Sequence, residues 1–188
     1  METFALVFNI IVAILVVAFT IYIWTCLLIS KGGKRPPFIP SIGKEKKIII
    51  EKASEYITKS KKKMKIMDPG CGSGSLLLPL AEKFGKHNFV GIDLGIIPYN
   101  LIKKKSEHLK NVEVYNDDMF KHSFKDVDLI VCFFTSQFAP MFSEKVLKDA
   151  KKGCVIISNS TELPNLKLIE KIPFRSWFFK SYVYVYRI

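Results

Sequence analysis

Residues 65–74 read KIMDPGCGSG, and this stretch decides the fold. It opens as a short apolar strand that ends at Asp68, and three glycines follow at alternate positions. Glycine adopts backbone conformations closed to other residues and lets a ligand approach the main chain. The helix expected over residues 75–84 would present free N–H groups at its N-terminus. The pattern D-x-G-x-G-x-G therefore predicts a strand, a turn able to hold a ligand, and a helix.

The rest of the chain continues this alternation of strands and helices. Further strands are expected at 88–92, 112–115, 128–134 and 154–158, and helices at 44–61, 99–108 and 143–150. Strands that alternate with helices favour a parallel sheet. Residues 166–172 and 182–187 predict two more strands that pair as an antiparallel hairpin at the sheet edge. The predicted fold class is α/β, with a mostly parallel sheet of seven strands and one N-terminal transmembrane helix.

Two acids stand where strands of this sheet end. Asp68 ends the first strand, and an acid there suits a cationic part of a ligand, such as an amino-acid ammonium. Asp93 ends the second strand in the sequence VGID, nineteen residues after Gly74. An acid at this place can accept hydrogen bonds from both hydroxyls of a ribose, as in nucleotide-binding units.

Three interpretations of the glycine turn compete, and a fourth is excluded because a Walker A loop needs Gly-Lys-Ser/Thr, which is absent. A dinucleotide motif from Gly70 needs Gly or Ala where Ser75 stands, and it leaves Asp68 unexplained. A turn without ligand would not need three glycines, each of which costs folding entropy. S-adenosylmethionine binding accounts for Asp68, the glycines and Asp93 together. We favour it, and the dinucleotide and the inert turn stay open.

The N-terminus predicts a membrane anchor. Residues 4–29 contain no charged side chain, and a bilayer core needs roughly 20 apolar helical residues. Glu2 is the only charge ahead of the run and no A-x-A-like site follows it, so an uncleaved anchor is favoured over a signal peptide. Because Lys31, Lys34 and Arg35 follow the run, the positive-inside rule predicts that residues 31–188 face the cytoplasm or the matrix.

These patterns divide the chain into an anchor at 1–30, a basic Pro/Gly linker at 31–43 and a domain at 44–188. We expect residues 4–29 to insert into the lipid bilayer, which is therefore one predicted partner. Within the linker KGGKRPPFIPSIG, the PFIPS segment at 37–41 is too apolar for a simple spacer, so we expect it to dock on the domain.

Composition excludes several classes of protein. The chain has 188 residues, 49% hydrophobic, and a mean hydropathy of +0.19, which excludes disordered and collagen-like chains. Its four cysteines form no CxxC pair and its three histidines have no ligand spacing, so neither a disulfide scaffold nor a metal site is expected. The net charge of +12 is mostly lysine, which fits a solvated surface or anionic lipid. Nucleic acid is not expected as a partner, because no aromatic-interleaved basic motif is present.

Three motifs resemble those of one enzyme superfamily. DPGCGSG (68–74) is similar to the first motif of class I, seven-strand S-adenosylmethionine-dependent methyltransferases, VGIDL (90–94) to their acidic motif, and NDDMF (116–120) to the segment that holds adenine. This resemblance implies a Rossmann-like three-layer sandwich. The apolar N-terminus followed by PFIPS, and DDMFKHSF (117–124), further resemble the membrane-associated protein-lysine methyltransferases. These include the mitochondrial enzymes that act on the ATP synthase c subunit and the adenine nucleotide translocase, with archaeal relatives.

The resemblance assigns roles to residues at the ends of the strands. The implied cofactor-binding residues are Asp68, Gly70, Cys71, Gly72, Gly74, Asp93, Leu94, Asp118 and Met119. Asp117 is the alternative to Asp118 for the adenine amino group. The implied substrate-side residues follow the fourth strand and are Phe134, Thr135, Ser136 and Gln137. No general base is identified.

The predicted function is that of a membrane-anchored S-adenosylmethionine-dependent methyltransferase acting on lysine of a protein, with a membrane protein as one candidate substrate. Alternative acceptors are a lipid or quinone-like molecule or RNA, and the alternative class is a non-catalytic, cofactor-binding membrane scaffold. An Asp/Asn-Pro-Pro-Tyr loop is absent after the fourth strand, which argues against methylation of DNA bases or glutamine. The chain departs from the lysine-specific relatives at Asp93, where they usually have Glu, and at Gly95-Ile96, where an Asn-Pro pair is expected.

Overall fold

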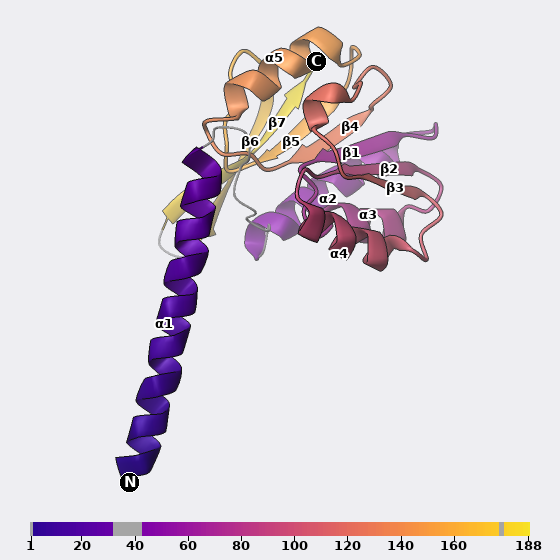
Figure 1. Ribbon diagram of the computed structural model, residues 1–188. Coiled ribbons are helices and arrows are strands. Elements are labelled where there is room, and N and C mark those ends of the chain that lie inside the picture. Colours follow the sequence, from indigo (N-terminus) through magenta and orange to yellow (C-terminus); the bar gives the residue numbers. More distant parts are fainter. Residues whose placement is uncertain (1, 32–42, 177–178) are drawn as a thin grey trace. The chain divides into compact units, whose positions relative to one another are not determined.

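The computed structural model describes residues 2–31, 43–176 and 179–188. The N-terminal helix and the following domain are separate units and are described individually (Figure 1). Helix α1 (Glu2–Lys31) contains an apolar span of 19 residues, Phe4–Tyr22, with a mean hydropathy of 2.9. Length and composition make this helix able to cross a bilayer, a test that an N-terminal signal sequence also passes. The expected docking of residues 37–41 falls outside the described residues.

The domain follows the alternation that the sequence predicts. Its helices are α2 (Lys44–Lys59), α3 (Leu77–Lys83), α4 (Ile96–Ser106) and α5 (Ala139–Asp149), with a 3-10 turn at Met119–Lys121. Its strands are β1 (Lys65–Pro69), β2 (Asn88–Ile92), β3 (Val112–Tyr115), β4 (Leu129–Cys132), β5 (Val155–Asn159), β6 (Leu168–Ser176) and β7 (Phe179–Arg187). Helices α4 and α5 begin three and four residues earlier than predicted, because Pro98 and Pro140 lie in their first turns, where proline is tolerated.

All seven strands form one sheet, in the order β3-β2-β1-β4-β5-β7-β6. The first five strands are parallel, and β7 runs antiparallel to both β5 and β6. The predicted α/β fold with a C-terminal antiparallel hairpin is therefore confirmed. The hairpin is longer than predicted: β5 ends at Asn159 opposite Val183, whereas the β6–β7 pairing continues to Ser176 and Phe179.

The sheet is buried on both faces, which makes the domain three-layered (Figure 1). Helices α2, α3 and α4 pack on one face, against side chains such as Ile66, Leu129 and Val131. Helix α5 packs on the other face, against Ile130 and Cys132. Neighbouring residues of β4 thus belong to opposite cores, which explains why its sequence is a continuous apolar run rather than an alternating one.

Two edges of this sheet carry the connections between strands and helices. We call the edge where β1–β5 end the carboxyl edge, and the edge where they begin the amino edge. The carboxyl edge holds the connections 70–76, 93–95, 116–118 and 133–138, and the amino edge holds 60–64, 84–87, 107–111, 122–128 and 150–154. In parallel α/β sheets, ligands bind at the carboxyl edge, so the glycine turn lies at the expected place.

Candidate cofactor and substrate site

The glycine turn has a main-chain shape that depends on its glycines. Gly70, Gly72 and Gly74 have φ values of 129°, 53° and 82°, all in the region that glycine favours. Gly74 is also enclosed, because a Cβ there would lie 2.6 Å from Leu78 Cγ and 2.9 Å from Ile102 Cγ1. The turn therefore packs tightly onto α3 and α4 as it passes from β1.

Backbone hydrogen bonds hold the turn against β2. The N–H groups of Gly70 and Cys71 both donate to the Ile92 carbonyl, at 2.8 and 3.0 Å. The Cys71 side chain is buried on Gly91, where a Cβ would lie 2.9 Å from its Sγ. Burial, followed by the charges of Asp68 and Asp93, raises the pKa of the Cys71 thiol, so Cys71 packs as a neutral side chain.

Gly91 is a residue that sequence reasoning missed. It lies inside β2, and a side chain there would meet both Cys71 Sγ and Leu77 Cδ2, at 2.9 and 3.0 Å. A glycine within an expected strand is the signal that was available, because such glycines often mark close approach of another segment.

Asp68 is a buried carboxylate at the end of β1. Its relative exposure is 4%, and none of the described residues donates a hydrogen bond to its carboxylate. Burial raises the pKa of Asp68 well above its usual range, and the charge of Asp93 adds to this effect. A buried, unpaired negative charge is costly, and a cationic group beside it removes that cost. The site is thus complementary to a cation.

Asp93 connects the glycine turn to the start of α4. Its Oδ2 accepts from the Gly72 N–H at 2.9 Å, and its Oδ1 accepts from the Gly95 N–H at 2.8 Å. Its own N–H donates to the Tyr115 carbonyl of β3 at 3.0 Å. Each carboxylate oxygen has more than one acceptor position, so this arrangement leaves capacity for two hydroxyl groups. Leu94 follows with its side chain exposed.

The segment after β3 distinguishes its two neighbouring acids. Asp117 is engaged by its own chain, because its carboxylate contacts Lys121 at 3.5 Å and His122 at 3.3 Å. The hydrogen bond from the Asp118 N–H outweighs the opposing effect of burial and, with the charge of Lys121, lowers the pKa of Asp117. The carboxylate of Asp118 accepts from the Phe120 N–H through Oδ1 and has no second partner among the described residues. Asp118 is therefore the freer acid beside Met119, which begins the 3-10 turn.

The residues after β4 differ in burial: the first is buried under the glycine turn and the later ones are exposed. Phe134 is buried, its ring centroid lies 4.5 Å from that of Phe142, and a Cβ on Gly70 would lie 3.6 Å from its ring. The ring of Phe134 therefore packs between the glycine turn and Phe142 of α5. Thr135 is half-buried, and the exposed pair Ser136–Gln137 forms the rim before α5. Thr161, which sequence reasoning did not single out, donates from its hydroxyl to the Phe134 carbonyl.

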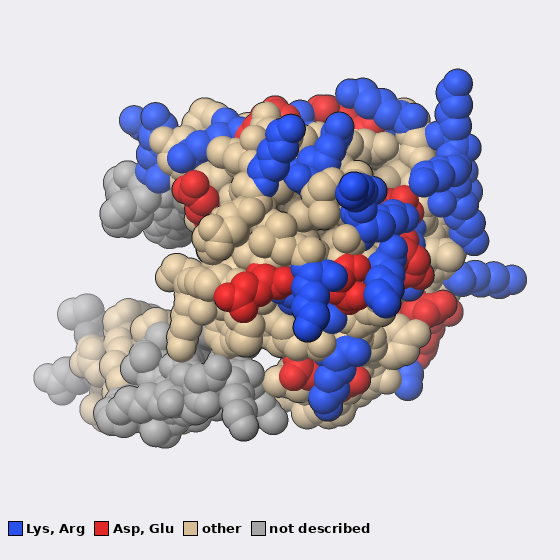
Figure 2. All heavy atoms as spheres, turned by 90° about the horizontal axis from the view of Figure 1, so that it is seen from above, with Lys and Arg blue, Asp and Glu red and all other residues tan. Residues whose placement is uncertain are grey.

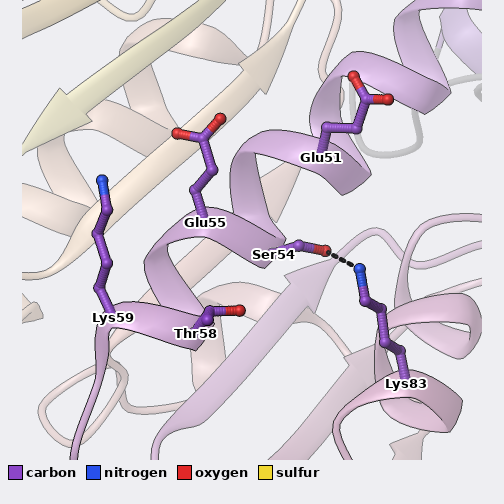
Figure 3. A pocket seen from close by; sticks show the side chains of 6 residues that line it. All are labelled: Glu51, Ser54, Glu55, Thr58, Lys59 and Lys83. Carbon is purple, nitrogen blue, oxygen red and sulfur yellow. Dashed lines mark hydrogen bonds between the residues drawn. The ribbon is translucent and has the colours of Figure 1, made fainter.

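The two described grooves do not coincide with these residues. The larger, about 530 Å³, lies between α2 and α3, and Lys83 Nζ donates across it to Ser54 Oγ at 3.5 Å (Figure 3). The second, about 400 Å³, crosses β1, β2 and β3 beside Tyr115 and His122. Neither contains a glycine of the turn or an implied cofactor residue, so main-chain geometry and buried charge define the candidate site.

Comparison with protein families identifies the domain. The family model described as the ANTKMT methyltransferase domain matches residues 68–170, more than half of the chain. The match begins at Asp68 and includes the whole glycine turn, Asp93 and the segment after β4. A comparison with curated proteins gave no match.

Solved structures of methyltransferases share the fold. An RNA methyltransferase from Salinibacter ruber in complex with S-adenosyl-L-homocysteine has a TM-score of 0.67 at 15% identity, covering 80% of this chain and 94% of that one. Magnesium protoporphyrin IX methyltransferase from Synechocystis PCC 6803 with bound SAM has a TM-score of 0.61 at 12% identity, covering 80% and 86%. A SAM-dependent O-methyltransferase from Thermotoga maritima gives 0.62 at 16% identity, covering 80% and 66%. At these identities the likeness shows the fold alone.

Proposed function

This chain belongs to the ANTKMT methyltransferase family, and we propose that it transfers the methyl group of S-adenosylmethionine to a lysine amine of a protein. S-adenosylmethionine is the cofactor of this methyltransferase fold. The observation that carries the proposal is the unpaired, buried carboxylate of Asp68 at the start of the glycine turn. It is complementary to the ammonium of a bound methionine group.

The remaining residues fit the other parts of the cofactor. The main chain of Gly70 and Gly72 would lie along the methionine part, and Asp93 would accept the ribose hydroxyls. Asp118 would accept from the adenine amino group, because its carboxylate has an oxygen without a described partner. Leu94 and Met119 would contact the ring and its surroundings.

Positioning is the main contribution that the chain makes to methyl transfer. The cofactor supplies an electrophilic methyl group on a sulfonium, and the acceptor nitrogen must meet it in line with the breaking bond. A lysine amine has to lose its proton first, and desolvation in an apolar site lowers its pKa. Phe134 supplies an apolar wall beneath the turn, and Thr135, Ser136 and Gln137 lie where an acceptor would approach.

Membrane anchorage through α1 is the second part of the proposal. It is supported by the apolar span Phe4–Tyr22 and by the cations Lys31, Lys34 and Arg35 that follow it. These cations favour a domain on the cytoplasmic or matrix side. An anchored enzyme meets acceptors at the bilayer at high effective concentration, which favours a membrane protein as the substrate.

The test is to incubate the full chain in detergent with methyl-tritiated S-adenosylmethionine and cell membranes, and to hydrolyse the labelled product. We expect label in methyl-lysine of one protein band. The control is Gly72→Arg, which places a long side chain at a positive φ of 53° over the cofactor site and should abolish labelling. Label in the lipid or RNA fraction would replace lysine by another acceptor. Cofactor binding without any label would support the scaffold alternative.

A further inference from the structure

Helix α4 exposes an apolar patch at its first turns. Ile96, Ile97 and Leu101 have relative exposures of 58%, 72% and 46%, and we call these three residues the α4 patch. Ile97 and Ile96 are the two most exposed large apolar side chains in the described part of the domain. Ile97 and Leu101 are four residues apart, so they lie on one face of the helix. Clustered exposed apolar side chains of this kind mark contact surfaces.

The α4 patch lies at the carboxyl edge, beside the candidate cofactor site. Helix α4 begins directly after Gly95, whose N–H donates to Asp93 Oδ1. The opposite end of the helix carries Lys103–Lys105 and points toward the amino edge. The helix is therefore apolar at the end near the cofactor residues and cationic at the far end.

The chain that arrives from α1 enters the domain at this same edge. Helix α2 ends at Lys59, and β1 begins six residues later, at the amino edge. A helix of 16 residues is about 24 Å long, so α2 starts at the other, carboxyl edge (Figure 1). Residues 32–42 join the two units, and 11 residues span at most roughly 40 Å. The chain that follows α1 therefore joins the domain at its carboxyl edge and not at its amino edge.

Cations accompany the apolar patch on this edge. The first turn of α2 presents Lys44 and Lys47 to solvent. In the part of the hairpin that extends past β5, exposed Arg175 pairs with exposed Lys180 across β6 and β7. Apolar side chains inserted at the acyl boundary, with lysine and arginine near the headgroups, are the composition of surfaces that rest on membranes.

We propose that the α4 patch rests on the surface of the membrane that α1 enters, so that the carboxyl edge and the methyl-transfer site face the bilayer. This inference rests on the proposed anchorage through α1, and it narrows the substrate to lysines that lie at the membrane surface. We choose lipid as the partner of the α4 patch for two reasons. Helix α1 is apolar enough to enter a membrane, and the chain that follows it joins the domain at the carboxyl edge, where the patch lies.

The experiment compares labels at the two edges of the full chain. A Cys26→Ser background leaves Cys71, Cys132 and Cys154, all buried. Ile97→Cys reports on the α4 patch, and Lys63→Cys, exposed at the amino edge, is the matched control. Each variant receives a polarity-sensitive fluorophore and is reconstituted into phosphatidylcholine–phosphatidylglycerol nanodiscs that contain a lipid-borne quencher. We expect quenching at position 97 to exceed that at position 63 by about fivefold or more, since quenching needs contact with lipid.

Equal quenching at the two positions would overturn the inference, as would stronger quenching at position 63. Shielding of position 97 only after a soluble acceptor protein is added would also overturn it and assign the patch to a protein. The double variant Ile96→Ser/Ile97→Ser should lower methylation of a membrane-embedded acceptor by roughly tenfold or more, because two apolar side chains that would contact lipid are lost. It should leave methylation of a soluble acceptor peptide unchanged. Formation of methyl-lysine by the wild-type chain tests the proposed function independently of the quenching.

Discussion

The two edges of one sheet have opposite chemistry in this domain. The amino-edge connections are rich in lysine, and in Figure 2 lysine and arginine side chains crowd the right-hand end of the domain, where these connections lie. The lysines of these connections are Lys61, Lys62, Lys63, Lys86, Lys110, Lys125, Lys151 and Lys152. The carboxyl edge instead presents the glycine turn and the buried Asp68. The same strand–helix alternation builds both edges, so the difference comes from the residues placed in the connections.

Two aspartates show what this difference means. At the amino edge, Asp128 is matched by Lys151 at 2.8 Å and by the Lys65 N–H at 2.9 Å. Burial alone would raise the pKa of Asp128, but these hydrogen bonds and the lysine charges outweigh it and lower the pKa. At the carboxyl edge, burial raises the pKa of Asp68, and no described residue compensates. At the amino edge, the charge of Asp128 is balanced by lysines of the protein itself. At the carboxyl edge, the carboxylate of Asp68 has no such partner among the described residues, and a cationic ligand would supply one.

The largest expected effect comes from a pair of glycines, one at each edge. Gly74 and Gly153 have similar φ values, 82° and 86°, but only Gly74 has neighbours within 4 Å of a built Cβ among the described residues. Gly74→Ala should lower the free energy of unfolding by about 3 kcal/mol or more, since backbone strain and overpacking add. Gly153→Ala should cost about 1 kcal/mol from strain alone. Denaturant unfolding measures both, and equal losses would mean that crowding at the turn is unimportant.

Removing one charge at each edge should have the next largest effect. Asp68→Asn should weaken S-adenosylmethionine binding by roughly 10- to 100-fold, the scale of a lost charged hydrogen bond, without destabilising the cofactor-free protein. Asp128→Asn should leave the affinity unchanged and lower the free energy of unfolding by about 1–2 kcal/mol, because Lys62 and Lys151 lose their partner. Titration calorimetry and denaturant unfolding give the two quantities. An Asp68→Asn protein that binds normally would remove the ammonium assignment.

The same comparison predicts how affinity depends on pH. Because the pKa of Asp68 is raised in the cofactor-free fold, its carboxyl is neutral below that raised value. A bound ammonium favours the ionised carboxylate, so affinity should rise with pH up to the raised pKa, and binding should release protons. Calorimetry in buffers of different ionisation enthalpy detects this release, and Asp68→Asn should abolish it.

Much of this architecture was predictable from local pattern. Strands β2 and β3 were predicted residue for residue, because polar residues flank both of them in the sequence. The predicted starts of α4 and α5 are three and four residues late, because each helix takes up a proline, Pro98 or Pro140, in its first turn. The length of the β6–β7 hairpin depends on pairing between strands, which no local period encodes.

The candidate site was predictable in its motif and not in its packing. Asp68, the glycines and Asp93 lie together at the ends of β1 and β2, as the spacing indicated. The burial of Cys71 on Gly91 depends on which segment packs there, information that only the assembled fold contains. Similarly, the burial of Phe134 beneath the turn follows from its contact with Phe142.

A comparable effect on cofactor binding is expected from Asp93, whose carboxylate bonds to two connections at the carboxyl edge. Asp93→Ala removes the acceptor of the Gly72 and Gly95 N–H groups, and it should weaken cofactor binding by about 1–3 kcal/mol. The matched variant is Asp126→Ala at the amino edge, whose ion pair with Lys65 is largely exposed. Such pairs contribute about 0–1 kcal/mol, so both affinity and stability should barely change. Unaltered binding in Asp93→Ala would contradict the ribose assignment.

The smallest expected effect is on the pH dependence of stability, through His87 in the amino-edge connection 84–87. His87 is fully buried, and its Nδ1 accepts from the Met64 N–H at 3.0 Å. Burial, then the charges of Lys86 and Lys63, lower the pKa of His87 against an opposing effect of Asp128. Since the folded pKa lies below the unfolded value, the stability contribution is complete above about pH 6.5 and is lost as the pH falls through the folded pKa. Thermal unfolding between pH 7.5 and 5 should therefore show a loss on acidification.

The variant Lys86→Gln tests whether the lysines of the amino edge lower the pKa of His87. Removing one cation should raise the folded pKa of His87 toward its unfolded value, so less stability is lost on acidification, and NMR titration of the imidazole should report the same shift. His87→Gln, which keeps an acceptor for the Met64 N–H, should remove the dependence on this group. Asp68 responds in the opposite sense, because its raised pKa makes acid stabilise the cofactor-free carboxyl edge. An unshifted His87 in Lys86→Gln would mean that burial alone, and not the cationic amino edge, keeps this imidazole neutral.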